Sequence, residues 1–326
     1  MKNIFKPAVP SAAVKIVILM GIAVLLSQCS KALHETKLQY MESMNSALAE
    51  SLKSRQDGYI RVLRTLASIM ADYENVPVGE RRDRYDQMLL TILRSEPEIT
   101  TLFTLWKPNA IDGLDSRRIA YAGSGPAGQY ALTFTNDSGL MEMGAVAGAD
   151  IDAIMEYING PNAKKDRVEE PVLVRLNGRD KYLIRMAVPI VNRRTNETIG
   201  VVGCLLNIDL IQKFLEQVIR DNYEIAAMAV YSNDGFILAS FVPDRVGKYM
   251  IDVDTIWGGH IREAERAVLE GRVFYCLSYS PVLSSNVEIF MTPVLIGDSL
   301  TTWSVMIAAT EEYFKGRRLL RRSFFR

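Results

Sequence analysis

Two apolar runs in the middle of the chain have the length of buried β-strands. They cover Leu183–Val191 and Ile199–Leu206, and the polar segment Asn192–Thr198 separates them. Apolar runs of this length, bounded by turn-forming residues, predict an antiparallel hairpin. Both runs are rich in valine, isoleucine and leucine with few polar interruptions. We therefore expect the hairpin to lie centrally in a sheet that another layer covers.

A long helix is predicted upstream of this hairpin. Residues 31–73 contain no proline and a single glycine, Gly58. Their apolar residues recur at helical spacing and form one stripe, which consists of Leu38, Met41, Leu48, Leu52, Leu63, Leu66 and Met70. Such a helix could carry a domain away from a membrane and pair with a second copy of itself, or its stripe could only cover its own domain's sheet. A shorter helix is expected over residues 79–95.

The rest of the chain predicts the same order of elements twice. Strand–turn–strand patterns run through residues 100–122 and 226–240, with an Asp-Gly dipeptide in each turn. A helical segment and a pair of strands follow each pattern, and a helical link over residues 211–222 joins the two halves. This repetition predicts an α+β fold of two related modules with antiparallel sheets.

The N-terminus has the composition of a membrane anchor. Within Ala8–Leu26 the only charged residue is Lys15, and this length is close to that of a membrane-spanning helix. Lys15, Lys2 and Lys6 lie on the N-terminal side of the apolar run, and these positive charges favour a cytoplasmic N-terminus and an exported remainder of the chain. A cleaved signal peptide and a lipoprotein anchored at Cys29 are the competing interpretations. Mass spectrometry of the mature N-terminus separates them, because lipid on Cys29 would exclude the uncleaved anchor.

Composition agrees with an exported globular body and narrows the function. Hydrophobic residues make up 48% of the chain and charged residues 23%, so the chain can bury a core. Its formal net charge is zero, and it therefore lacks the excess of positive charge that is typical of nucleic-acid-binding proteins. The three cysteines are widely spaced, which excludes a disulfide framework and gives no zinc pattern.

The candidate catalytic motifs are weak. Gly123–Gly128 matches the dinucleotide pattern G-x-G-x-x-G, but that pattern needs a following helix, and residues 129–135 predict a strand. Two histidines are too few for a metal site or a proton relay, and Asp150 and Asp152 have the spacing of helix-capping residues. We therefore expect no enzyme, no cofactor and no metal site.

Several short motifs follow one another in a characteristic order: Trp106–Asp115, Gly128–Tyr130, Tyr157–Asp166, Val188–Ile190, Gly200–Gly203, Ser232–Gly235 and Val246–Lys248. Together they resemble the double Cache sensor domains of bacterial methyl-accepting chemotaxis receptors, and they look closest to those of spirochaetes. The resemblance covers residues 31–312. It implies two tandem PAS-like modules behind a long N-terminal helix, a ligand pocket in the membrane-distal module, and signalling by population shift.

Hydropathy and the resemblance together divide the chain into six parts. These are a cytoplasmic N-terminus (1–7), a transmembrane anchor (8–30), the long helix (31–73), a membrane-distal Cache module (74–212), a membrane-proximal Cache module (213–312) and a basic tail (313–326). We expect a single-pass protein of the cytoplasmic membrane with periplasmic Cache modules, which forms a homodimer through the long helix.

The function that this organisation predicts is small-molecule sensing by a chemotaxis receptor. Receptors of this family continue into a second membrane helix and a signalling domain, whereas this sequence ends at Arg326. We interpret that end as a truncation; a basic tail that binds anionic headgroups is the other interpretation. An exported ligand-binding lipoprotein, and the sensor half of a histidine kinase or diguanylate cyclase, are the alternative functions.

The amino-acid contacts of the family transfer poorly to this chain. Relatives that bind amino acids use an arginine, a tyrosine and two aspartates, where this chain has Gln129, Val172, Val174 and Leu205. An α-amino acid would therefore lose its ion pairs.

The remaining candidate pocket residues are mostly aromatic or hydroxyl-bearing. They suit a small, weakly charged organic ligand such as a purine, a sugar-like or an aromatic compound. The candidates are Trp106, Tyr121, Gln129, Tyr130, Thr133, Thr135, Asp152, Tyr157 and Leu205. Aromatic residues at these spacings would also suit an ordinary core, and a domain that reports a separate periplasmic protein is the alternative.

We predict that α-amino acids do not stabilise residues 31–312 in a thermal-shift assay. A true ligand at a hundredfold excess over its dissociation constant should stabilise the segment by about 2.7 kcal/mol. A clear shift with any α-amino acid would contradict the assignment of Val172, Val174 and Leu205.

Overall fold

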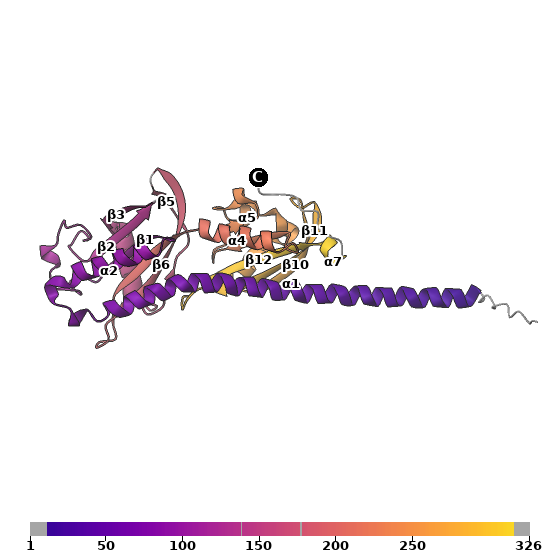
Figure 1. The fold of residues 1–326 in the computed structure, drawn as a ribbon, viewed down its shortest axis with the longest axis horizontal. Coiled ribbons are helices and arrows are strands. Elements are labelled where there is room, and N and C mark those ends of the chain that lie inside the picture. The colour runs from indigo at the N-terminus through magenta and orange to yellow at the C-terminus, as the bar shows by residue number, and fades with distance from the viewer. Residues whose placement is uncertain (1–11, 138, 177, 316–326) are drawn as a thin grey trace, which may run out of the picture.

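The computed structural model describes residues 12–137, 139–176 and 178–315, and its fold is α+β. Helix α1 (Ala12–Met70) runs along two β-sheets and extends past the second (Figure 1). It confirms the helix predicted over residues 31–73 and continues it towards the N-terminus. Within the described residues, no helix is both long and apolar enough to cross a membrane. The anchor predicted over residues 8–30 begins outside them and stays a prediction.

The first module is an antiparallel sheet with a helix on each side. Its seven strands in the described residues have the order β3-β2-β1-β7-β6-β4, with β5 paired to β6. The elements are α2 (Arg81–Ser95), β1 (Ile99–Trp106), β2 (Ala131–Asp137), β3 (Leu140–Ala145), α3 (Gly148–Asn159), β4 (Arg167–Val168), β5 (Val172–Leu176), β6 (Arg179–Val191) and β7 (Thr198–Asn207). β6 and β7 form the predicted hairpin, and β7 lies between β6 and β1 in the centre of the sheet.

The second module follows helix α4 (Asp209–Asp221), the predicted helical link. Its sheet has five strands in the described residues, in the order β10-β11-β12-β8-β9. The elements are β8 (Ala227–Tyr231), β9 (Ile237–Ser240), α5 (Met250–Val253), α6 (Ile261–Leu269), β10 (Phe274–Ser280), β11 (Ser285–Leu295), β12 (Thr302–Thr310) and α7 (Glu311–Phe314). The hairpin predicted over residues 226–240 is confirmed as β8 and β9.

The hairpin predicted over residues 100–122 is wrong in its second half. β1 forms as expected, but its antiparallel partner is β2, and residues 107–130 connect the two as a long loop. Asp112, which we expected in the turn of this hairpin, and Asp115 instead pair with Arg82 of α2. These ion pairs hold the loop against the helix, so it does not return along β1.

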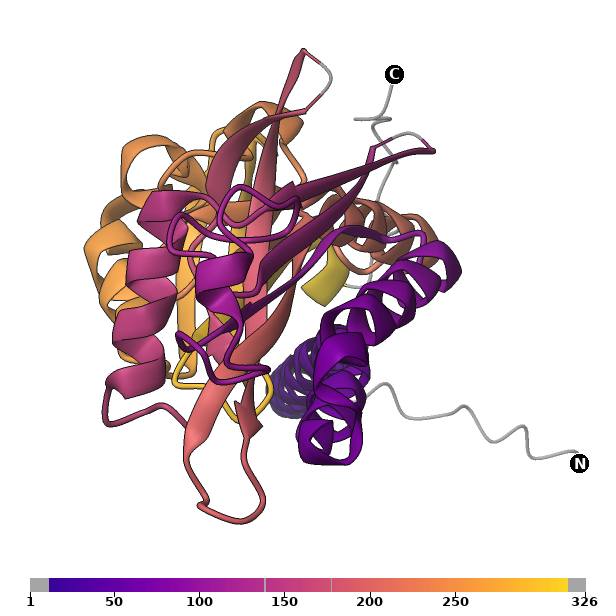
Figure 2. The same ribbon diagram turned by 90° about the vertical axis from the view of Figure 1, so that its left-hand side faces the viewer.

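α1 is a common layer for both modules. Its residues Leu52, Leu63 and Met70 are fully buried, and they belong to one apolar cluster that also contains Val202 of the first sheet and Ile307 of the second. On the first sheet, α1 covers one face and α3 covers the other (Figure 2). The alternation of side chains along each strand therefore decides which residues face α1 and which face α3.

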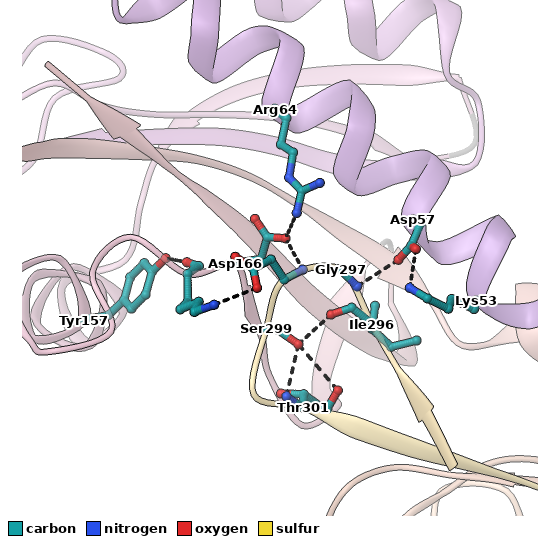
Figure 3. Close-up of polar contacts among 11 residues, drawn as sticks. Lys53, Asp57, Arg64, Tyr157, Asp166, Ile296, Gly297, Ser299 and Thr301 are labelled. Atoms are coloured by element: carbon teal, nitrogen blue, oxygen red, sulfur yellow. Dashed lines mark hydrogen bonds and ion pairs between the residues drawn. The ribbon is translucent and has the colours of Figure 1, made fainter. Parts of the chain in front are cut away.

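A polar joint ties the turn between β11 and β12 to α1 and to the first module (Figure 3). The backbone N–H of Gly297 donates to Asp57 Oδ1 of α1 at 2.8 Å, and that of Asp298 donates to Asp166 Oδ2 at 2.7 Å. Arg64 Nη2 of α1 lies 2.5 Å from the same oxygen of Asp166. One carboxylate thus bridges the helix and both modules.

We predict that Gly203→Ala destabilises the first module. A Cβ at this position of β7 would lie 2.3 Å from Phe103 Cζ and 2.5 Å from the carbonyl oxygen of Met186. Overpacking of this kind costs about 1–3 kcal/mol in the free energy of unfolding, which urea denaturation measures. Gly148→Ala is the matched control, because an added Cβ there meets nothing within 4 Å. Equal effects of the two substitutions would contradict this packing argument.

Candidate ligand-binding site

α3 covers the outer face of the first sheet only in part. Its isoleucines pack on Phe103, Leu105, Ala131 and Val201, which form a small apolar cluster of their own. Further along the same face, a row of residues crosses five strands, each opposite the next in the strand pairing. This polar row consists of Glu142, Thr135, Thr101, Leu205 and Arg185. Most of its members are only half-buried, so a small molecule could contact them.

An ion-pair cluster stands at the end of the polar row. Arg185 Nη2 lies 2.7 Å from Asp150 Oδ1 of α3, and Arg185 Nη1 lies 2.9 Å from Glu169 Oε2. Arg167 Nε lies 2.8 Å from Glu169 Oε1, and its guanidinium lies 5.3 Å from the ring centroid of Tyr157. Two arginines and two carboxylates give the cluster no net charge.

Asp150 is the member of the cluster that a ligand could displace. The side chain of Arg185 is 12% exposed and that of Glu169 is 17% exposed, whereas that of Asp150 is 40% exposed. Asp150 is the more exposed carboxylate, so water hydrates it when it leaves the guanidinium of Arg185. A ligand therefore displaces Asp150 from Arg185 at a lower cost in free energy than it would displace Glu169.

Four predicted site residues lie on this side of the sheet. Thr133 and Thr135 are on β2, and Thr135 Oγ1 lies 3.0 Å from Thr101 Oγ1. Leu205 lies between Thr101 and Arg185 in the polar row, and Tyr157 contacts the ion-pair cluster through Arg167. The structure thus brings these four into one region.

The other five predicted residues are not in this region. Trp106 and Tyr130 are buried in the opposite core, with α1 and α2. Gln129 is buried in the loop before β2, whereas Tyr121 and Asp152 are exposed. A role for any of the nine in binding stays a prediction.

The ion-pair cluster does not follow from any motif of the sequence. Arg185 is the only charged residue within the apolar run Leu183–Val191, and a charge on a buried strand is a signal that could have indicated it. Arg167 and Glu169 lie in or beside the two-residue strand β4. No local pattern places these two beside Arg185.

The loop between β1 and β2 is held by one buried arginine. Arg82 Nε lies 2.7 Å from Asp112 Oδ2, and Arg82 Nη2 lies 2.6 Å from Asp115 Oδ1, with all three side chains at most 6% exposed. Arg82 Nη1 also donates to the carbonyl oxygen of Gly128 at 2.9 Å. The motif Trp106–Asp115, which supports the family resemblance, therefore serves to fix the loop.

The electrostatics of this contact depend on Arg82. Burial alone would raise the pKa of Asp112, but hydrogen bonds from Arg82 and from the backbone N–H of Leu114 outweigh it, and the pKa of Asp112 lies below its ordinary value. Asp112 is therefore ionised throughout the neutral range.

The fold is similar to that of solved extracellular sensor domains. The periplasmic sensory domain of the Campylobacter jejuni chemoreceptor Tlp1 has a TM-score of 0.64 at 15% identity, over 87% of this chain and 98% of that one. The extracellular domain of a protein described as the histidine kinase mmHK1S-Z3 has a TM-score of 0.68 at 19% identity, over 86% and 96% of the two chains.

A third similar structure contains a ligand. It is the ligand-binding domain of the Pseudomonas aeruginosa PAO1 amino acid chemoreceptor PctC in complex with GABA, with a TM-score of 0.53 at 16% identity, over 83% of this chain and 98% of that one. No sequence-family model and no curated protein sequence matches the chain. The long helix and the two sheets thus match double Cache sensor domains in fold.

We predict that Arg82→Met lowers the free energy of unfolding by about 3–5 kcal/mol at neutral pH, because it leaves two buried carboxylates without their cation. The loss should shrink towards about pH 4, where protonation removes the uncompensated charges. In the unsubstituted protein, the lowered pKa of Asp112 contributes stability above its unfolded-state pKa, and this contribution disappears as the pH falls through the folded-state pKa.

Urea denaturation across this pH range measures the effect. Arg84→Met, an exposed arginine on the same helix, is the matched control and should have little effect at any pH. A loss at Arg82 that does not depend on pH would contradict the electrostatic explanation.

Proposed function

We propose that the chain is the extracytoplasmic ligand-sensing region of a methyl-accepting chemotaxis receptor, and that it binds rather than catalyses. The observation that supports this most is the combination of a sensor-domain fold with the polar row and the neutral ion-pair cluster on one face of the first module. In this proposal, the first module is the membrane-distal one, and α1 leads away from the membrane and pairs with a second copy of the chain.

The chemistry of the face supports a small organic ligand of low net charge. Threonine hydroxyls at Thr101, Thr133 and Thr135 both donate and accept hydrogen bonds, and Leu205 offers an apolar contact beside Thr101. The PctC domain was solved with GABA. In this chain, the middle of the polar row carries no charge that would hold the ammonium group of an amino acid.

The segment after α3 offers a route from this face to the second module. Arg167 and Glu169 belong to the ion-pair cluster, whereas Asp166 and Glu170 contact the second module. Asp166 accepts from the turn between β11 and β12, and Glu170 accepts from the hydroxyl of Ser232. Alternate residues of an extended segment point to opposite sides, so Arg167 and Glu169 face the cluster while Asp166 and Glu170 face the second module. A ligand that moves the cluster would therefore also move Asp166, and with it the polar joint in Figure 3.

A sensor histidine kinase is the second candidate. The specific observation in its favour is the extracellular domain described as that of mmHK1S-Z3, whose TM-score of 0.68 exceeds the 0.64 of the Tlp1 domain. Sequencing beyond the codon for Arg326 distinguishes the two. A methyl-accepting signalling domain would support the chemoreceptor, and a kinase core would support the alternative.

We predict that the whole chain shows a saturable thermal shift with a member of a panel of nucleosides, sugars and aromatic compounds. Thr133→Val keeps the shape of the side chain but removes its hydroxyl, so the affinity for that compound should fall about tenfold without loss of stability. Thr195→Val, at an exposed position in the turn between β6 and β7, is the matched control and should leave the affinity unchanged. The absence of any shift, or equal effects of the two substitutions, would count against a site on this face.

A further inference from the structure

A cleft lies away from the polar row, where the middle of α1 passes the start of α4. Its volume is about 380 Å³, which lies within the range of small-molecule sites. Its lining comes from α1, from the segment between α2 and β1, and from the first two turns of α4. The cleft thus lies on the helix common to both modules and on the helix that joins them.

The cleft contains a side-chain amide that has no hydrogen-bond partner in the described part of the chain. Gln56 of α1 is 5% exposed and lines the cleft, and within the described part of the chain its carboxamide makes no hydrogen bond. Its amide atoms are not sealed from solvent, so they are reached through the cleft. The amide of Gln56 is therefore available to a ligand, both as donor and as acceptor.

The charged residues of the lining favour a cation. They are Arg55, Glu96 and Glu98, which leave one negative charge uncompensated. The guanidinium of Arg55 lies 5.1 Å from the ring centroid of Phe214. The aromatic face of this cleft therefore already holds a cation from the protein itself. Glu98 also accepts a hydrogen bond from the hydroxyl of Tyr59, which fixes its carboxylate at the rim.

Gly58 keeps one wall of the cleft open. It lies in the interior of α1, where glycine is less favourable than alanine, and a Cβ added there would meet no other atom within 4 Å. Close packing therefore does not require a glycine at this position. The space that a side chain would fill belongs to the cleft that Gly58 lines.

We propose that this cleft binds a small organic cation that carries N–H donors. Its positive group lies beside the carboxylates of Glu96 and Glu98, and one of its N–H groups donates to the side-chain oxygen of Gln56. The site is separate from the polar row and does not depend on it. Because its occupant contacts both α1 and α4, it would favour one arrangement of the two modules over another.

Calorimetric titration of the whole chain at neutral pH tests this proposal, with butylammonium and butylguanidinium as probes. Butan-1-ol is the neutral comparator and butyrate the anionic one. We expect saturable binding of at least one cation, and none of either comparator. Glu98→Gln should weaken that binding about tenfold, since it removes a charge-assisted contact. Glu50→Gln, an exposed glutamate of α1 outside the cleft, should leave it unchanged.

Gln56→Met separates binding from folding. Methionine has a similar shape without the amide, so binding should also weaken about tenfold while the melting temperature stays the same or rises. A lower melting temperature would show that the amide has a structural partner, and this would overturn the proposal. So would equal binding of butan-1-ol, the absence of saturable binding by both cations, or an affinity that neither Glu98→Gln nor Gln56→Met changes.

Discussion

The apolar stripe of α1 is the constraint on which the two modules depend. Each sheet has one face that packs against α1, and α1 joins these two faces in one continuous cluster that includes Leu66, Val202 and Ile307. A layered fold is stable only when each apolar face is covered. Because one rigid helix covers both sheets, a change in how the first sheet sits on α1 also changes the surroundings of the second.

Polar contacts give this apolar assembly a defined geometry. Buried ion pairs contribute little net stability, but their directionality selects one arrangement. Asp166 joins Arg64 of α1 to the turn between β11 and β12, and Arg82 fixes the long loop to α2. Such contacts have few alternative partners, so they are suited to elements that move between two discrete positions.

The polar row and the cleft beside α4 lie on different elements of the same fold. The row lies on the sheet face away from α1, and its cluster reaches the second module through the residues around β4. The cleft lies on α1 itself, beside Gln56 and Phe214. A ligand in either place would act on the contact between the modules, the first through β4 and the second through the helices.

The sequence by itself determined the elements whose pattern is local: the stripe of α1, the β6–β7 hairpin and the repeated order of strands and helices, because each has a period that neighbouring residues reveal. Only the tertiary structure decided that residues 107–130 form a loop held by Arg82, and that Trp106 and Tyr130 lie in the core shared with α1 and α2. It also decided that Arg185 meets Asp150 and Glu169. These contacts join residues from separate elements, and the directions of their side chains depend on strand register and packing, which no local pattern encodes.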